Sequence, residues 1–216
     1  MILGLGSGST AEAFVRELGA RVRSGLRVRG VATSDRTARL AQELGIPLLP
    51  LDDVSAIDLG IDGADEIAPS LDVVKGRGGA LLHEKLVALA CDRYLIVAAA
   101  EKLVTLLGTR MPLPVEVVPF GWHLTAARLP ALGLDPTLRL TNAQSDDPAP
   151  FVSDGGHYVL DCATDPITDP AALARDLKAT PGVVDHGLFI GFADRVLVVD
   201  AAGEPRIMDR EPHRAS

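Results

Sequence analysis

Residues 1–11 read MILGLGSGSTA and lead into an amphipathic run that extends to about Val22. This order of apolar, glycine and hydroxyl residues predicts a strand, a tight turn and a helix. Ser9 or Thr10 is expected to cap that helix. Backbone N–H groups at such a turn, together with the hydroxyls of Ser7, Ser9 and Thr10, predict a site for an anion such as phosphate.

Three known motifs do not fit this turn. The dinucleotide pattern G-x-G-x-x-G, started at Gly4, requires a glycine where Ser9 stands. The Walker pattern requires a lysine that is absent here, and the hydrolase elbow G-x-S-x-G does not fit the register. A plain glycine-rich turn therefore remains the alternative to a phosphate loop.

The following segments continue the alternation of strand and helix. Strands are expected over residues 26–32, 47–51 and 54–61, and a helix over 36–44. Such alternation with short turns is typical of an α/β fold with a mostly parallel sheet. Because ligands of these sheets bind beyond the carboxyl ends of the strands, the loops after them are expected to line one rim.

The most highly charged part of that rim is IDGADE, residues 61–66, followed by KGRGGALLHEK, residues 75–85. Charges so close to apolar runs are costly to bury unless they are paired or used. The glycine-rich turn after Lys75 opens a helix, which is typical of an oxyanion site. Asp62 and Asp65, taken alone, could equally be solvated turn residues.

Glu84 lies on a helix expected over residues 80–90, and the residues three and four positions away from it are all apolar. We expect this helix to be buried, so that desolvation favours neutral Glu84 and makes its carboxylate a stronger base. A purely structural ion pair is the alternative. Lys102 follows a buried strand and is expected either to reach the same rim or to be solvated.

From Pro112 onward the regular alternation ends. Strands are expected near 113–120, 138–140, 151–162 and 189–199, and helices over 124–132 and 170–179. A polar loop at 142–150 and a polar tail after Asp209 complete the chain. This pattern predicts a smaller α+β domain over 109–192, inserted into a larger one formed by 1–108 and 193–216.

Composition excludes several classes of protein. A net charge of −8 without a basic tract argues against nucleic-acid binding. No apolar run is long enough to span a membrane, and the first residues do not form a signal peptide. The histidines lack metal-ligand spacing, and the two cysteines are expected to be reduced core thiols. We therefore expect a soluble, cytoplasmic and metal-free protein.

Motifs along almost the whole chain resemble those of type A ribose-5-phosphate isomerases. The matching segments are GLGSGSTA (4–11), TS (33–34), LGIPL (44–48), DGADE (62–66), KGRGGALLHEK (75–85), LPVEV (113–117), DGG (154–156), PGV (181–183) and GLF (187–189). The resemblance implies a Rossmann-like core with a smaller α+β domain. It also implies a homodimer or homotetramer and no metal or cofactor.

The resemblance further implies that the substrate is a sugar phosphate. Ribose 5-phosphate and ribulose 5-phosphate would interconvert in the pentose phosphate pathway. Glu84 would move a proton between C2 and C1 through an ene-diolate, assisted by Asp62, Asp65 and Lys75. The implied substrate-binding residues are Ser7, Gly8, Ser9, Thr10, Asp62, Gly63, Ala64, Asp65, Lys75, Gly76, Arg77, Gly78 and Lys102.

Two features depart from that family, and other functions compete with it. Arg77 interrupts a run that is usually glycine, and the sequence begins on a strand that a helix normally precedes. A protein that only senses sugar phosphates would not need Glu84 on an apolar helix. The function of a nicotinamide dehydrogenase is disfavoured because Ser9 stands where the dinucleotide motif requires glycine. Acyl or coenzyme A transfer on a related fold could also use a glutamate, and the residues alone leave it open.

Overall fold

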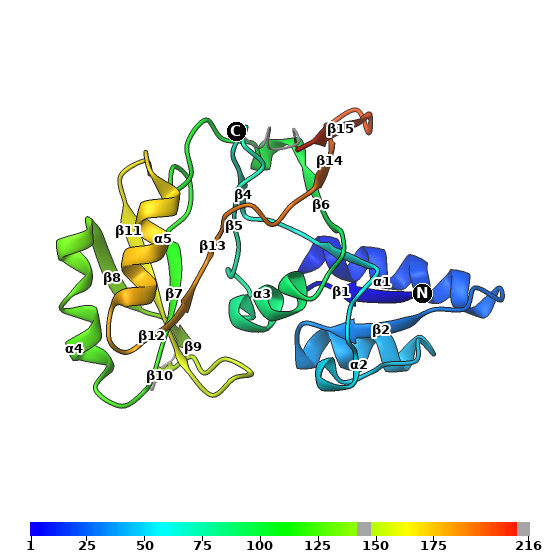
Figure 1. Cartoon of the computed structure of the whole chain (residues 1–216), viewed down its shortest axis with the longest axis horizontal. Coiled ribbons are helices and arrows are strands. Elements are labelled where there is room, and N and C mark those ends of the chain that lie inside the picture. Colours follow the sequence, from blue (N-terminus) through cyan, green and yellow to red (C-terminus); the bar gives the residue numbers. More distant parts are fainter. Residues whose placement is uncertain (142–147, 211–216) are drawn as a thin grey trace.

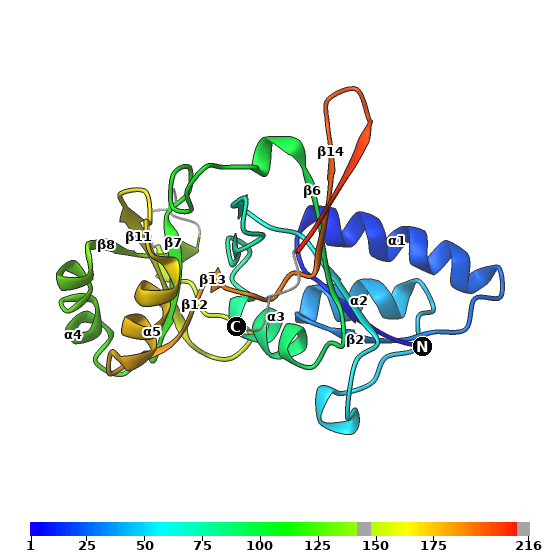
Figure 2. The same ribbon diagram turned by 45° about the horizontal axis from the view of Figure 1, so that its top comes forward.

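The computed structural model describes residues 1–141 and 148–210. Figures 1 and 2 show two sheets that lie side by side, with helix α3 between them. Most of the polar loop predicted at 142–150 and of the tail predicted after Asp209 falls outside the described ranges.

The larger sheet has six strands in the order β15-β14-β6-β3-β1-β2, and all but one of its pairings are parallel. Its strands are β1 (Ile2–Leu5), β2 (Arg29–Ala32), β3 (Leu59–Asp62), β6 (Tyr94–Ala99), β14 (Arg195–Val199) and β15 (Pro205–Asp209). The chain leaves β1 toward β2 on one side and returns to β3 on the other. This reversal between β1 and β3 confirms the predicted Rossmann-like class and leaves a crevice at the carboxyl ends.

Helices cover both faces of this sheet. On one face, Val15 of α1 (Ser9–Arg23) and Leu40 of α2 (Asp35–Glu43) share a core with Leu5. On the other face lies α3 (Leu81–Leu89), which approaches so closely that a Cβ on Gly4 would come within 2.9 Å of Val87. A side chain at this glycine would therefore push the helix off the sheet.

The smaller sheet has four strands in the order β12-β7-β11-β8. They are β7 (Leu113–Val117), β8 (Leu134–Leu138), β11 (Tyr158–Thr164) and β12 (Val183–His186). Helices α4 (Trp122–Ala126) and α5 (Pro170–Ala179) lie beside it (Figure 1), and β9 (Leu140–Thr141) pairs with β10 (Ala149–Pro150). Its core contains the fully buried Leu113, Leu160 and Leu177.

A short third sheet connects the two larger ones. It contains β4 (Glu66–Ile67), β5 (Val73–Val74) and β13 (Leu188–Phe189), in the order β13-β5-β4. Strand β13 follows directly after β12 yet pairs with β5, so the chain crosses between the sheets here. The division of the chain at 108/109 and 192/193 stays a prediction.

Several predicted elements were wrong in detail. Residues 47–51 form a single bridge between Leu48 and Gly30 and a 3₁₀ turn (Leu51–Asp53), and β3 begins only at Leu59. The helix predicted over 124–132 splits into α4 and a 3₁₀ turn that contains Pro130, because proline lacks the N–H that a continuous helix needs. Neither Ser9 nor Thr10 caps α1: Gly8 occupies the cap at φ 87° without a side-chain bond.

No helix in residues 1–141 and 148–210 is both long and apolar enough to cross a membrane.

Helix α3 is less enclosed than its apolar sequence predicted, because Leu86 and Leu89 are exposed while Glu84 and Lys85 are buried. Two charged side chains therefore face the interior of the protein at this helix together with Leu81, which is fully buried.

Candidate active site

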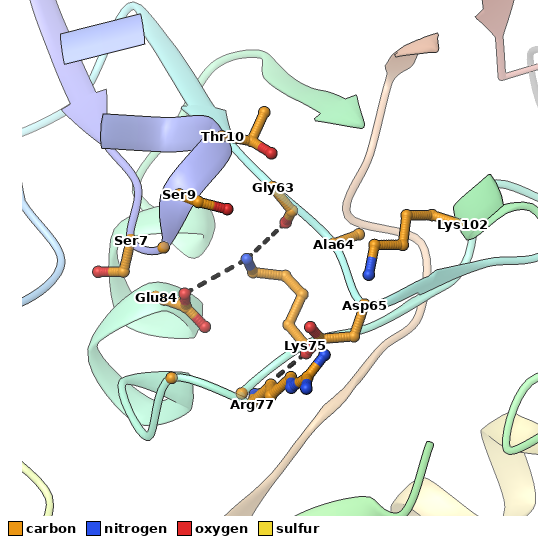
Figure 3. Close-up of a pocket in the computed structure, with 13 residues that line it drawn as sticks. Ser7, Ser9, Thr10, Gly63, Ala64, Asp65, Lys75, Arg77, Glu84 and Lys102 are labelled. Carbon is orange, nitrogen blue, oxygen red and sulfur yellow. Dashed lines mark hydrogen bonds and ion pairs between the residues drawn. The ribbon is translucent and has the colours of Figure 1, made fainter. Parts of the chain in front are cut away.

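A cavity of about 340 Å³ opens where the loops after β1, β3 and β6 meet the loop after β5. Every predicted site residue except Asp62 lines it (Figure 3). The lining consists of Ser7, Gly8, Ser9, Thr10, Gly63, Ala64, Asp65, Lys75, Gly76, Arg77, Gly78, Glu84 and Lys102. The structure therefore brings these residues to one cavity, at depths that the sequence could not give, and their roles stay predictions.

Asp62 lies behind the cavity wall and is 1% exposed. Its Oδ1 accepts hydrogen bonds from the Ser7 N–H at 3.1 Å and the Gly63 N–H at 2.7 Å. Its Oδ2 accepts from the Tyr94 hydroxyl at 3.1 Å and pairs with Lys75 Nζ at 3.0 Å. With these four partners Asp62 is saturated, so its predicted contact with substrate stays a prediction while its hold on Lys75 is direct.

Tyr94 was missed by the sequence reasoning, although a signal existed. It begins the buried strand β6 and is 3% exposed. A tyrosine buried to this degree nearly always gives its hydroxyl a polar partner. Burial, followed by the charges of Asp62 and Glu84, raises the pKa of Tyr94 well above its usual value. It therefore donates a hydrogen bond to Asp62 as a neutral phenol.

Lys75 extends from the end of β5 into the centre of the site and is 3% exposed. Its Nζ donates to the Gly63 carbonyl at 2.6 Å and lies 3.0 Å from Asp62 Oδ2 and 3.4 Å from Glu84 Oε1. Burial lowers the pKa of Lys75, but the carboxylates of Asp62 and Glu84 outweigh burial and raise that pKa above its ordinary value. Lys75 is therefore a fixed cation at this position.

Glu84 faces Lys75 from the first turn of α3 and is 5% exposed. Its Oε1 pairs with Lys75, whereas Oε2 is buried and has no hydrogen-bond partner among the described residues. Burial raises the pKa of Glu84 to about 8 against the opposing charge of Lys75, with smaller contributions from Asp62 and Asp65. A carboxylate oxygen without a partner, at the wall of a cavity, is available to accept a proton from a bound molecule.

The glycine-rich loop after Lys75 forms the floor beside Glu84. Gly76 and Gly79 have φ values of 104° and 84°, which residues with a side chain rarely adopt. The Arg77 N–H donates to Asp65 Oδ2 at 3.0 Å, which connects this loop to the loop after β3. The Arg77 side chain is exposed at the rim and adds a positive charge that Gly would lack.

The opposite end of the cavity is the N-terminus of α1, whose first N–H groups have no partner within the helix. Ser9 and Thr10 expose their hydroxyls there, and Lys102 reaches the same space from the 3₁₀ turn after β6. The Ser7 hydroxyl points away from Lys75 in Figure 3 and bonds to Thr33 at 2.7 Å and Ser34 at 2.8 Å. Ser7 also lines the cavity, but its hydroxyl is engaged by these two partners, so its contact with a substrate stays a prediction.

Glu66 and Lys85, although part of the charged stretch, serve other structures. Glu66 is fully buried and accepts N–H bonds from Gly108 at 2.6 Å and Arg110 at 2.5 Å. Lys85 Nζ lies 2.5 Å from Asp185 Oδ1 and 2.6 Å from the His186 carbonyl. Their partners lie up to a hundred residues away in the sequence, so local spacing could not reveal these bonds.

The group around Lys85 predicts acid sensitivity. Burial and the nearby Lys85 lower the pKa of His186 to about 4, and its Nδ1 accepts the Leu188 N–H at 3.2 Å. His186 takes up a proton in the unfolded chain near pH 6.5 but not in the folded one. We expect its contribution to the unfolding free energy, on the order of 3 kcal/mol, to be lost as pH falls through this window.

Urea unfolding at a series of pH values tests this expectation. His186→Asn keeps an acceptor near the position of Nδ1, and it should flatten the dependence of the unfolding free energy on pH between pH 6.5 and about 4. The control variant His123→Asn, at an exposed position, should not flatten it. An equally steep dependence in the His186 variant would contradict the assignment.

The fold and the cavity together define a class of protein. It is a Rossmann-like α/β protein with a crevice at the strand ends, where cations and helix N–H groups favour an anionic small molecule despite the net charge of −8. Among the residues of the described ranges, no group of three or more His, Cys, Asp or Glu side chains is placed to hold a metal ion.

Comparison with known proteins narrows this class. The family description "Ribose 5-phosphate isomerase A (phosphoriboisomerase A)" matches residues 29–203. Ribose-5-phosphate isomerase A of Thermomicrobium roseum is 54% identical, with 97% of this chain and 87% of that protein covered. The corresponding protein of Gloeobacter violaceus is 52% identical, with 94% and 86% covered.

Solved structures agree with the sequence comparison. A D-ribose-5-phosphate isomerase in complex with phospho-erythronic acid superposes with a TM-score of 0.92 at 35% identity, covering 97% of this chain and 91% of that one. The ribose 5-phosphate isomerase of Plasmodium falciparum superposes with a TM-score of 0.92 at 34% identity, covering 98% of this chain and 92% of that one. The chain belongs to the ribose 5-phosphate isomerase A family.

Proposed function

We propose that this chain interconverts D-ribose 5-phosphate and D-ribulose 5-phosphate as an aldose–ketose isomerase of the pentose phosphate pathway. The observation that carries the proposal is Glu84: a buried carboxylate with one unpartnered oxygen, 3.4 Å from the Lys75 ammonium, at the wall of a cavity with an anion-binding end. An isomerisation of this kind needs one base that serves two adjacent carbons, together with a group that stabilises an oxyanion.

The phosphate binds at the N-terminus of α1. The N–H groups at Gly8, Ser9 and Thr10 and two exposed hydroxyls face it, and Lys102 supplies a positive charge from the other side. The cavity volume of about 340 Å³ lies within the usual range for small-molecule sites. With the phosphate at this end, the other end of the open-chain sugar reaches the glycine loop, Lys75 and Glu84.

Proton transfer takes place at that second end. Glu84 removes the proton from C2 of the aldose while the C1 carbonyl takes up the electron pair, which gives an ene-diolate. Lys75 and the N–H groups of the glycine loop stabilise the negative charge on its oxygens. Glu84 then returns the proton to C1, while the hydroxyl proton on O2 passes to O1. The C2 oxygen thereby becomes the carbonyl of the ketose, and the C1 oxygen becomes a hydroxyl. No net oxidation occurs, and the base ends in its starting form.

The two aspartates have different positions and therefore different proposed roles. Asp65 lines the cavity and is available to sugar hydroxyls and to the ring-opening proton transfer, along with Gly63, Ala64, Gly76, Arg77 and Gly78. Asp62 acts from behind the wall by fixing Lys75, and its contact with the sugar itself remains part of the proposal. We also expect the protein to act in the cytoplasm, without a metal or cofactor.

The direct test is to incubate the protein with ribose 5-phosphate in the presence of a chelator and to measure ribulose 5-phosphate. We expect ketose to form at the same rate with and without the chelator. A panel of other pentose and hexose phosphates in the same assay measures how selective the site is. Absence of ketose from a folded protein would contradict the proposal.

The rate should depend on pH through Glu84. A base must be ionised to accept a proton, and the pKa of Glu84 is raised to about 8 by burial. We therefore expect kcat/KM to rise with pH until the pH passes about 8, because this ratio reports the free enzyme. Initial rates from about pH 6 to about pH 10 measure it, and a flat profile below pH 8 would contradict the assignment.

The chain is expected to assemble as a homodimer or homotetramer. Phe120 is 95% exposed and Leu124 on the adjacent α4 is 57% exposed, which is unusual for large apolar side chains on a monomer. Sedimentation analysis of the purified protein decides between one, two and four subunits.

A further inference from the structure

Arg139 connects the smaller sheet to the glycine loop of the candidate active site. It lies between β8 and β9, where its N–H donates to the Val159 carbonyl at 2.8 Å and its carbonyl accepts the Phe151 N–H at 2.8 Å. Its guanidinium pairs with Asp161 through two nitrogens, with Nε at 2.9 Å from Oδ2. These contacts within the smaller sheet therefore fix both the backbone and the side chain of Arg139 independently of the loop.

The third nitrogen of this guanidinium reaches the loop itself. Arg139 Nη1 donates to the Gly76 carbonyl at 3.1 Å and to the Arg77 carbonyl at 3.0 Å. The same guanidinium lies over the Phe151 ring, 5.6 Å from its centroid. A Cβ on Gly79 would come within 2.3 Å of that ring, so Phe151 packs directly against the end of the loop.

These carbonyl bonds determine where the loop N–H groups point. In a planar trans peptide the N–H is directed opposite to the carbonyl oxygen. The peptide group that contains the Gly76 carbonyl also contains the Arg77 N–H. This N–H donates away from Arg139, to Asp65 Oδ2 at 3.0 Å. The next peptide carries the Gly78 N–H, and Gly78 lines the cavity. Arg139 thus holds two peptides with their positive ends turned from itself toward the site.

The loop needs such an anchor because of its composition. Glycine loses more conformational freedom on ordering than any other residue, and three of the four residues 76–79 are glycine. Apart from the Arg139 contacts, Gly76 and Arg77 are held on this side by the short turn in which the Gly79 N–H donates to the Gly76 carbonyl at 2.9 Å. Within residues 76–79, no hydrogen bond of the loop itself involves the Arg77 carbonyl or the Gly78 N–H, the two polar groups of the Arg77–Gly78 peptide.

We propose that Arg139 is a positioning residue of this isomerase, acting from the smaller sheet on two peptides of the glycine loop. It orients the Arg77–Gly78 peptide, whose N–H binds the oxyanion, and, through the Arg77 N–H of the preceding peptide, the carboxylate of Asp65. The proposal rests on the proposed function of the cavity. Arg139 does not line that cavity but a second one, which shares Asp65 and Arg77 with it. We therefore infer that Arg139 acts through the loop rather than by direct contact with substrate.

The effect on catalysis should fall on the chemical step. The phosphate end of the cavity, at α1 and Lys102, has no contact with Arg139, so ground-state binding keeps most of its partners. The reacting end loses orientation, and a displacement of about 1 Å there costs about 10²-fold in rate. We expect Arg139→Gln to lower kcat by about that factor while KM changes much less.

The matched control is Arg195→Gln. Arg195 also forms an arginine–aspartate pair between neighbouring strands, at 2.5 Å to Asp209 across β14 and β15, but it does not approach the cavity. The Arg195→Gln variant should therefore keep kcat within about twofold of the wild-type value. Arg139→Lys keeps the charge but not the forked geometry, so it should fall between the Gln variant and the wild type, and it serves as the test if the Gln variant does not fold.

Amide hydrogen exchange of the segment 76–79 separates this proposal from the proposed function. Exchange should be about tenfold faster in the Arg139 variants than in the wild type, with exchange of the β1 and β6 strands unchanged. This readout needs no activity, so it stands even if the wild type makes no ketose. Unchanged exchange in a folded Arg139 variant, or a kcat within twofold of the wild type, would overturn the positioning role.

Discussion

Replacing Glu84 with Gln is expected to lower kcat by roughly 10³- to 10⁴-fold, the upper part of the range for loss of a general base. Glutamine has the same shape and keeps a carbonyl oxygen near Lys75, so the cavity retains its form and its positive charge. Substrate binding should therefore persist, and KM should stay within a few-fold of the wild-type value. Steady-state rates over a range of ribose 5-phosphate concentrations measure both parameters.

The control is Glu101→Gln, which removes a carboxylate that is exposed near the rim, next to Lys102. It should leave kcat almost unchanged. Near-normal turnover in the Glu84 variant would show that another group moves the proton, even if the protein proved to be an isomerase.

The same substitution should affect stability in the opposite direction. The folded state raises the pKa of Glu84 from 4.5 to about 8, so the folded chain binds more protons than the unfolded one between these values. Ionisation of wild-type Glu84 therefore lowers the free energy of unfolding as pH rises through this window. Glutamine does not ionise, so Glu84→Gln should be more resistant to urea than the wild type above about pH 8.

Lys75→Met should have the second largest effect, on both activity and stability. Methionine fills the space but leaves the buried Asp62 without its cation and Glu84 without its only partner among the described residues. Breaking a buried ion pair in this way costs about 3–5 kcal/mol of unfolding free energy. Loss of a preorganised cation at the oxyanion should lower kcat by at least about 10²-fold.

A double variant separates the two effects. Combining Lys75→Met with Asp62→Asn removes the uncompensated charge, so urea unfolding should recover much of the lost stability. The rate should stay low, because the missing ammonium is not replaced. A double variant that regained both stability and activity would contradict the electrostatic role proposed for Lys75.

The fold could be predicted to a large extent because its signals are local. The glycine-rich turn at 4–8 and the alternation of strand and helix were sufficient for the parallel sheet, and that sheet places the loops after β1 and β3 together. The apolar neighbours of Glu84 likewise indicated its burial. Short elements such as residues 47–58 were predicted poorly, since β-branched and apolar residues there pack without extended pairing.

The site could be predicted as a set of residues but not as a network. Nothing near Asp62 in the sequence shows that Tyr94 and Ser7 saturate it, because Tyr94 comes from strand β6 and Ser7 from the loop after β1. The orientation of the Ser7 hydroxyl depends on Thr33 and Ser34 in the same way. Arg139 is separated from its partner Gly76 by 63 residues in the sequence, so local spacing could not reveal this contact.

The central claim is that Glu84 carries a proton, rather than a hydride moving directly, between C2 and C1. The most direct measurement is conversion of ribose 5-phosphate in deuterium oxide, with the deuterium located in ribulose 5-phosphate by NMR. The account predicts solvent deuterium at C1 in part of the product from the wild type, and almost no product from Glu84→Gln at the same enzyme concentration. Product without deuterium at C1 after many turnovers, together with near-normal turnover by Glu84→Gln, would contradict it, since the hydrogen would then move without this base and without exchange with solvent.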